Sequence, residues 1–219
     1  ALPKLGKQHF PERHMGLVPT PEHSWARDSL DAIADTTARH VDLDAVTEIA
    51  RSAGPLKPAA GDKDDLLATD AEQADRTSPV IGIIKDAAFQ FYYPENFEAL
   101  TAAGAKIVFI SPFERQSIPE VDAIYIGGGF PETHARELAN NTSFRKDLKS
   151  LADQGLPIYA ECGGLMYLGQ SLVLGGVTYP MVGLLPVVFG FSKRPQGHGY
   201  TIFEVEKPNP YFRPGTQVR

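Results

Sequence analysis

Hydrophobic residues in the larger, C-terminal part of the chain form short continuous runs that alternate with segments of helical spacing. The runs predict strands at residues 80–84, 106–110, 123–126 and 157–160. The segments of helical spacing are at residues 93–103 and 132–154. Continuous apolar runs are typical of strands buried on both faces, and the order strand, helix, strand favours parallel pairing. The pattern therefore predicts an α/β fold with a mostly parallel sheet.

Glycine and proline break the apolar pattern into shorter runs after residue 169. These runs are at residues 172–174, 181–188 and 200–205. Short runs bounded by turn residues are typical of antiparallel strands. We therefore expect antiparallel strands appended to the edge of the parallel sheet.

The N-terminal part follows a different pattern. Residues 15–18 predict one buried strand, and apolar positions from Trp25 to Ala53 recur at helical spacing, which predicts two helices separated near His40. The segment 54–78 carries prolines, glycines and an acidic run with little periodic hydrophobicity, so we expect a linker. The sequence thus predicts three regions, which are residues 1–53, the linker 54–78 and the α/β domain 79–219.

Composition and charge exclude several classes of protein. The 219 residues are 42% hydrophobic and 22% charged, which is ordinary for a globular chain and excludes wholesale disorder. A net charge of −6 argues against nucleic acids and anionic membrane surfaces as partners, and the apolar runs are too short to cross a bilayer. The single cysteine cannot form an internal disulfide, which favours a cytoplasmic protein. We expect no metal site.

That cysteine, Cys162, stands between an apolar strand and a predicted helix, with Ala160 before it and Gly163 and Gly164 after it. A cramped strand-to-helix turn presents a nucleophile and needs small neighbours. The start of a helix also favours the thiolate. A lone cysteine is otherwise often a small buried hydrophobe, but the flanking small residues favour the nucleophile here.

A triple glycine, residues 127–129, follows the run at 123–126. Backbone N–H groups of such a bend, together with the amide of Gly163, can bind the oxyanion of a tetrahedral intermediate. The alternative is a merely flexible turn. Both loops follow parallel strands, and ligands bind at the carboxyl ends of such strands. The chain contains no phosphate-binding loop of the Walker type.

The catalytic base is harder to place. Acyl transfer through a cysteine calls for a histidine within hydrogen-bond reach, and among six histidines only His198 follows the cysteine. Its position in a glycine-flanked loop makes it a weak candidate. The segment after the first strand of the domain carries Asp86, Phe89, Tyr92 and Tyr93, which either cap the core or line a site for a bulky planar acceptor.

Three segments together resemble the cobyrinate (or hydrogenobyrinate) a,c-diamide synthase family. They are residues 86–96, 125–132 and 159–168. The resemblance covers about residues 79–219 and implies a flavodoxin-like class I glutamine amidotransferase fold, in which Cys162 hydrolyses glutamine through a thioester and releases ammonia. It also implies an oxyanion hole formed by Gly128, Gly129 and Gly163. The glutamine pocket that it implies consists of Phe130, Pro131 and Glu132.

Residues 12–19 resemble the end of the family's ATP-dependent synthetase domain, which would make residues 1–53 the C-terminal remnant of that domain. In the family, ATP and Mg²⁺ activate the a and c carboxylates of a corrinoid acid, and ammonia converts them to amides. We expect no cofactor in this chain, and a homodimer is one candidate assembly. The family's histidine motif is expected beyond Arg219, so this piece alone should have little or no glutaminase turnover.

Three other functions fit parts of the pattern. The first is a related synthetase that amidates another tetrapyrrole, and the second is a different hydrolase or peptidase with a cysteine elbow. The third is a binding module that retains a glutaminase fold without turnover. Agreement among three separate segments favours the diamide synthase.

Overall fold

The computed structural model describes residues 2–3, 12–13, 16–18, 24–55, 78–192, 199–209 and 212–218. Near the N-terminus, β1 (Glu12–Arg13) and β2 (Gly16–Leu17) pair antiparallel. Two helices follow, α1 (Ala26–His40) and α2 (Leu43–Ser52), which confirms the predicted break near His40. Asp42 begins α2 by accepting a hydrogen bond from the Ala45 N–H at 2.9 Å. Most of the predicted linker lies outside the described residues.

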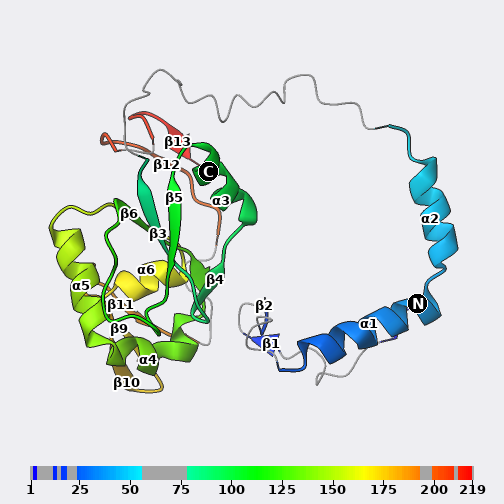
Figure 1. Cartoon of the computed structure of the whole chain (residues 1–219), viewed down its shortest axis with the longest axis horizontal. Coiled ribbons are helices and arrows are strands. Elements are labelled where there is room, and N and C mark those ends of the chain that lie inside the picture. The colour runs from blue at the N-terminus through cyan, green and yellow to red at the C-terminus, as the bar shows by residue number, and fades with distance from the viewer. Residues whose placement is uncertain are drawn as a thin grey trace.

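Four parallel strands form the central sheet of the C-terminal part (Figure 1). They are β3 (Val80–Ile84), β5 (Lys106–Ile110), β6 (Ala123–Ile126) and β8 (Ile158–Ala160). Their order across the sheet is β5-β3-β6-β8. This order places the first strand in sequence between the second and the third, as in flavodoxin-like folds. The predicted fold class and the four predicted strands are confirmed.

Helices cover the sheet on opposite sides, with α3 on one side and α5 on the other (Figure 1). The helical elements are α3 (Pro94–Ala102), the 3₁₀ helix η2 (Pro131–His134), α4 (Ala135–Asn140), α5 (Thr142–Asp153) and α6 (Gly163–Leu168). The segment 132–154, expected to be helical, is thus divided into three. The break at Asn141 has a local cause, because its side chain accepts a hydrogen bond from the Phe144 N–H at 3.2 Å and so begins α5.

One face of the sheet forms the main hydrophobic core. Ile84 and its neighbours in register, Ile110 and Ile126, are almost completely buried. The helical residues that pack with them are Leu138, Phe144, Leu148 and Tyr167. This packing fixes the carboxyl ends of β3 and β6, where the candidate site is built. No helix within the described ranges is both long enough and apolar enough to cross a bilayer.

Short strands complete the C-terminal part in three small sheets. They are β4 (Phe89–Phe91), β7 (Gly128–Gly129), β9 (Ser171–Leu174), β10 (Val177–Pro180), β11 (Val188–Gly190), β12 (Phe203–Glu204) and β13 (Gln217–Val218). The pairs β4–β7, β9–β10 and β12–β13 are antiparallel, whereas β11 pairs parallel with β9.

Two details differ from the expected appended strands. These small sheets have their own hydrogen-bonded ladders and do not extend the four-stranded sheet. The run at 181–188 is a strand only from Val188 onward. Its earlier residues bond to the end of α6 instead, because Val182 donates to the Tyr167 carbonyl and Leu184 donates to the Leu168 carbonyl, both at 3.0 Å.

Candidate active site

Cys162 occupies the predicted elbow between β8 and α6. Its backbone has φ 44° and ψ −108°, and it is the one non-glycine residue with positive φ in the described part of the chain. Such a conformation costs about 1–3 kcal/mol and is kept only when the surroundings enforce it. Here the Glu161 N–H donates to the Ile126 carbonyl at 2.9 Å, and the Met166 N–H donates to the Cys162 carbonyl at 3.1 Å. The Cys162 side chain is exposed, so the buried-hydrophobe reading does not apply.

The elbow is packed too closely to accept side chains at its two glycines. A Cβ placed on Gly163 would lie 2.8 Å from the Pro131 Cδ and 3.0 Å from the Gly129 nitrogen. A Cβ placed on Gly164 would lie 2.5 Å from the Ile126 carbonyl oxygen. At each glycine the nearest of these contacts is shorter than packed side chains allow. The two glycines therefore let the elbow approach the end of β6 and the triple glycine.

The triple glycine is an ordered element and not a flexible turn. Gly128 and Gly129 form β7, which pairs antiparallel with Phe91 and Phe89 of β4. A Cβ on Gly129 would lie only 2.1 Å from the Ala88 carbonyl oxygen, so the two backbones are in direct contact. This pairing fixes the bend to β4.

The bend and the elbow lie side by side, as the proposed site requires. A Cβ on Gly128 would lie 3.4 Å from the Cys162 Cβ. The Gly127 carbonyl accepts a hydrogen bond from the Gly164 N–H at 3.1 Å, which joins the two loops directly. Gly128, Gly129 and Gly163 are thus gathered around the cysteine. Their binding of an oxyanion stays a prediction.

A cavity of about 460 Å³ opens beside Cys162. Its walls are formed by Gln90, Phe91, Tyr92, Tyr93, Gly128, Glu161 and Cys162. Its size is within the usual range for small-molecule sites. The sequence suggested that Tyr92 and Tyr93 line a site for a planar acceptor. In the structure they line the same cavity as Cys162.

None of the three residues predicted for the glutamine pocket lines this cavity. Phe130 is only 2% exposed and packs edge-on against Phe91, with ring centroids 5.2 Å apart. Pro131 is buried against Gly163. Phe130 and Pro131 are therefore buried beside the bend, and their role in a glutamine pocket stays a prediction. A role for Glu132 stays a prediction.

Asp86 and Phe89 build the loop after β3. The Asp86 carboxylate accepts hydrogen bonds from the Ala88 and Phe89 N–H groups at 2.8 and 3.3 Å and from the Ser111 hydroxyl at 3.3 Å. Phe89 has no exposed surface and packs on Tyr167, with ring centroids 5.4 Å apart. Phe89 therefore cannot touch an acceptor, which corrects that assignment. Asp86 lines a separate cavity of about 370 Å³ with Arg115, and its acceptor role stays a prediction.

Burial raises the pKa of the Asp86 carboxyl above its ordinary value of 3.8, and the hydrogen bonds from Ala88, Ser111 and Phe89 oppose this only in part. The folded protein thus favours the protonated Asp86 carboxyl. The contribution of Asp86 to the free energy of unfolding is fully present below pH 3.8 and is lost as the pH rises through the raised pKa. We expect Asp86→Asn to remove this part of the pH dependence. Urea denaturation of both proteins between about pH 4 and 7 measures it.

The matched control for Asp86→Asn is Asp153→Asn, because the Asp153 carboxylate is exposed in an ion pair with Lys149. This variant reports what the same chemical change does at the surface. Equal slopes for wild type and Asp86→Asn would contradict the effect assigned to burial of Asp86.

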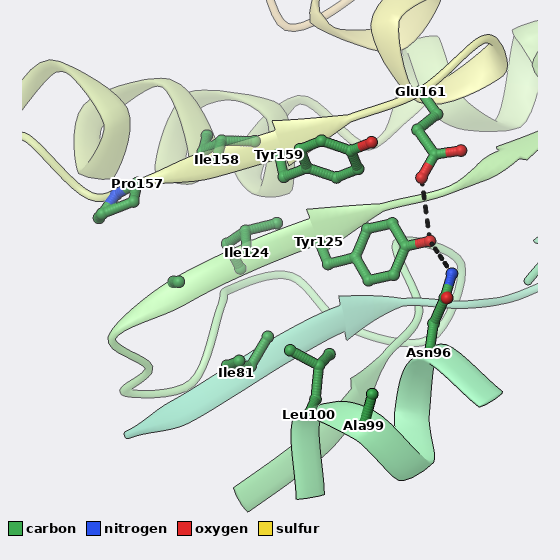
Figure 2. A pocket seen from close by; sticks show the side chains of 11 residues that line it. Ile81, Asn96, Ala99, Leu100, Ile124, Tyr125, Pro157, Ile158, Tyr159 and Glu161 are labelled. Atoms are coloured by element: carbon green, nitrogen blue, oxygen red, sulfur yellow. Dashed lines mark hydrogen bonds between the residues drawn. The ribbon is translucent and has the colours of Figure 1, made fainter. Parts of the chain in front are cut away.

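Tyr92, Tyr125 and Glu161 form the polar surroundings that sequence reasoning largely missed. The Tyr92 hydroxyl donates to the Ile84 carbonyl and accepts from the Gly127 N–H. The Tyr125 hydroxyl donates to Glu161 Oε1 at 3.0 Å and accepts from the Asn96 side chain at 3.4 Å (Figure 2). Burial raises the pKa of Tyr125, and Glu161 raises it further through the hydrogen bond and its charge. The sequence signal was only that Tyr92 follows β3, that Tyr125 is in the apolar run that forms β6, and that Glu161 follows β8.

Glu161 also borders a second hollow. An apolar groove of about 520 Å³ runs over β3, β6 and β8 on the α3 side, and Glu161, Tyr125 and Asn96 stand at its polar end (Figure 2). Ile81, Leu100, Ile124 and Ile158 line its apolar length. Glu161 is thus shared between this groove and the Cys162 cavity.

The predicted base, His198, lies outside the described residues. His40 is in α1, where its Nδ1 lies 2.9 Å from the Thr36 carbonyl oxygen. His134 packs on the Phe113 ring, with centroids 5.4 Å apart. Neither of these described histidines lines the Cys162 cavity. The structure therefore assigns no base.

Comparison with protein families gives one match that spans the site. The profile of the CobB/CobQ-like glutamine amidotransferase domain matches residues 80–213. This range contains the loop after β3, the triple glycine and the cysteine elbow. The three elements that meet at the cavity therefore belong to one recognised domain.

Curated relatives extend the similarity to the N-terminal part. A cobyrinate a,c-diamide synthase of Listeria innocua is 38% identical over 218 residues, which are 100% of this chain and 46% of the relative. One of Archaeoglobus fulgidus is 39% identical over 202 residues, covering 92% of this chain and 42% of the relative. One of Magnetococcus marinus is 38% identical over 200 residues, covering 91% and 42%. The chain therefore spans less than half the length of these relatives.

Proposed function

Because the chain belongs to the CobB/CobQ-like glutamine amidotransferase domain family, we propose that it supplies ammonia from glutamine within a cobyrinate a,c-diamide synthase. The observation that carries this proposal is the contact between the strained Cys162 elbow and the Gly128 bend at the wall of one cavity. A nucleophile beside ordered backbone amides is the arrangement that acyl transfer requires.

The reaction starts with attack of the Cys162 thiolate on the side-chain carboxamide carbon of glutamine. A carbon–sulfur bond forms, and the carbonyl electron pair moves onto oxygen, where backbone N–H groups of the glycine bend and Gly163 stabilise it. The intermediate collapses with cleavage of the carbon–nitrogen bond, and ammonia leaves once its nitrogen has received a proton. Water then hydrolyses the thioester, which releases glutamate and restores the thiolate.

The proton transfers need a general acid and base. Within the described ranges no histidine lines the Cys162 cavity. We propose that a histidine outside the described residues has this role. His198 is a weak candidate among them.

Ammonia then converts the a and c carboxylates of a corrinoid acid to amides. Amide formation requires an activated carboxylate, which ATP and Mg²⁺ would supply in the complete protein. The present residues do not fit that role, because the chain has no phosphate-binding loop. In the described part of the chain, no group of three or more His, Cys, Asp or Glu could hold a metal ion. We therefore place activation outside this chain.

The acceptor is best tested with the complete synthase, ATP and glutamine labelled with ¹⁵N in its side-chain amide. We expect two labelled nitrogens in the product from cobyrinate or hydrogenobyrinate, and none in a tetrapyrrole that is not a corrinoid. The names of the relatives favour the corrinoid over other tetrapyrroles. Labelling of a different tetrapyrrole alone would replace the proposed substrate and leave the glutaminase step in place.

Diazo-oxonorleucine, an electrophilic glutamine analogue, separates this function from that of a peptidase or a binding module. We expect it to alkylate Cys162, and glutamine should protect the residue. Mass spectrometry of the modified peptide measures this. The predicted cytoplasmic location and homodimer stay predictions.

A further inference from the structure

The site lies where the order of strands changes direction. In the sheet order β5-β3-β6-β8, the chain first moves from β3 outward to β5 and then returns to add β6 on the other side of β3. β3 and β6 are neighbours whose following connections leave in opposite directions. A crevice forms at the carboxyl ends of such a pair, and sheets of this kind bind ligands there. Ile84 ends β3 and Ile126 ends β6, and these two residues are partners in the ladder.

The Tyr92 hydroxyl bridges β3 and β6 just beyond their last ladder pair. It donates to the carbonyl of Ile84 and accepts from the N–H of Gly127 at 2.8 Å. Gly127 is the first residue after β6, where the chain leaves the sheet to form the glycine bend. The phenol thus continues the hydrogen bonding between the two strands after the backbones have separated. It uses its single proton and one lone pair in doing so.

Gly127, the residue that Tyr92 holds, also bonds to the cysteine elbow. The Gly127 carbonyl accepts from the Gly164 N–H at 3.1 Å, at the start of α6. The Gly127 backbone lies close to the ring, because a Cβ there would lie 2.6 Å from the Tyr92 Cε1. One residue, Gly127, therefore connects the Tyr92 hydroxyl through its N–H with the start of α6 through its carbonyl.

The ring of Tyr92 is itself held in place. It packs against Phe97 with centroids 5.4 Å apart and edge-on against Tyr125 with centroids 5.2 Å apart. Burial raises the pKa of Tyr92, and the neighbouring Tyr125, Asp86 and Glu161 raise it further. The phenol therefore remains a neutral donor at neutral pH.

We propose that Tyr92 is a positioning residue of the glutaminase site, whose hydroxyl fixes Gly127 so that Gly128 and Gly129 keep their place beside Cys162. This inference rests on the proposed function. A donor that is misplaced by a fraction of an ångström loses much of its stabilisation of a developing oxyanion. Loss of the Tyr92 hydroxyl should therefore slow the chemical step more than it weakens glutamine binding.

The test is Tyr92→Phe in the complete synthase, assayed for glutamine hydrolysis. We expect kcat to fall about 10- to 100-fold, while KM changes less than about threefold. Amidation driven by ammonium chloride, which bypasses the glutaminase step, should stay within about twofold of wild type. This difference separates a positioning role from general damage to the fold.

Tyr167→Phe is the matched control, because Tyr167 is a buried tyrosine whose hydroxyl has no hydrogen-bond partner among the described residues. It removes the same atom from the same domain, and it should leave glutamine hydrolysis unchanged. Wild-type kcat in Tyr92→Phe would overturn the assignment. An equal loss of ammonium-driven amidation would overturn it as well.

Cys162→Ala, assayed alongside, separates failure of this inference from failure of the proposed function. If Cys162→Ala retains glutamine hydrolysis, the proposed function is wrong, and the role of Tyr92 falls with it. If Cys162→Ala loses hydrolysis while Tyr92→Phe keeps it, only the role of Tyr92 is wrong.

Discussion

Cys162→Ala in the complete synthase should lower glutamine-driven amidation by about a thousandfold or more. In the proposed mechanism the Cys162 sulfur forms the covalent bond with glutamine. Removal of a covalent nucleophile lowers the rate by a factor of this size or larger. Amidation driven by ammonium chloride should stay within about twofold of wild type, because it does not pass through the thioester. Steady-state rates with the two nitrogen sources measure both effects.

The strained backbone provides a control that is specific to this elbow. Cys162 has φ 44° and ψ −108°, a region that glycine enters freely and alanine does not. Cys162→Gly should therefore be as inactive as Cys162→Ala with glutamine, but more stable by about 1 kcal/mol. Glutamine-driven activity in either variant would disprove the role of the thiol. Equal stability of the two would disprove the strain.

The second large effect is expected at Gly129. A Cβ there would lie 2.1 Å from the Ala88 carbonyl oxygen, and this atom belongs to a backbone that cannot rotate away. Gly129→Ala must therefore separate β7 from β4 and shift the bend beside Cys162. We expect glutamine hydrolysis to fall about 100- to 1000-fold, as when an oxyanion-hole donor is lost, with ammonium-driven amidation much less affected.

Gly190→Ala is the matched substitution for Gly129→Ala. Gly190 is also in a short strand, but its Cβ would have only an ordinary contact, 3.7 Å from the Val173 carbonyl oxygen. This variant should hydrolyse glutamine at the wild-type rate. If Gly129→Ala did the same, the bend would not take part in the reaction.

The sheet and the elbow could be predicted from the sequence because their signals are local. Continuous apolar runs marked all four strands, and small residues around Cys162 marked the strand-to-helix turn that its positive φ now shows. The same reasoning placed the triple glycine at the end of β6. It left open whether that segment was ordered, since the pairing of β7 with β4 joins residues far apart in sequence.

The hydrogen bonds that hold the site in place could not be predicted, because they too join residues far apart in the sequence. Tyr92 and Gly127 are 35 residues apart, and Tyr125 and Glu161 are 36 apart, so no sequence spacing announces either hydrogen bond. The resemblance implied a ligand pocket for Phe130 and Pro131, and it gave no sign that Phe130 packs against Phe91 or that Pro131 lies against Gly163. A hydrophobic residue in a loop motif does not reveal which of its sides is buried.

The walls of the Cys162 cavity come from loops that follow three different strands, and this has a consequence for folding. Tyr92, Gly128 and Glu161 meet only after β3, β6 and β8 have aligned and β7 has paired with β4. Such long-range contacts form late, after the entropy of closing the intervening loops has been overcome. A chain in which these strands have not yet aligned would therefore carry the thiol without the cavity, so the capacity to bind a small molecule there should appear only when the sheet is complete.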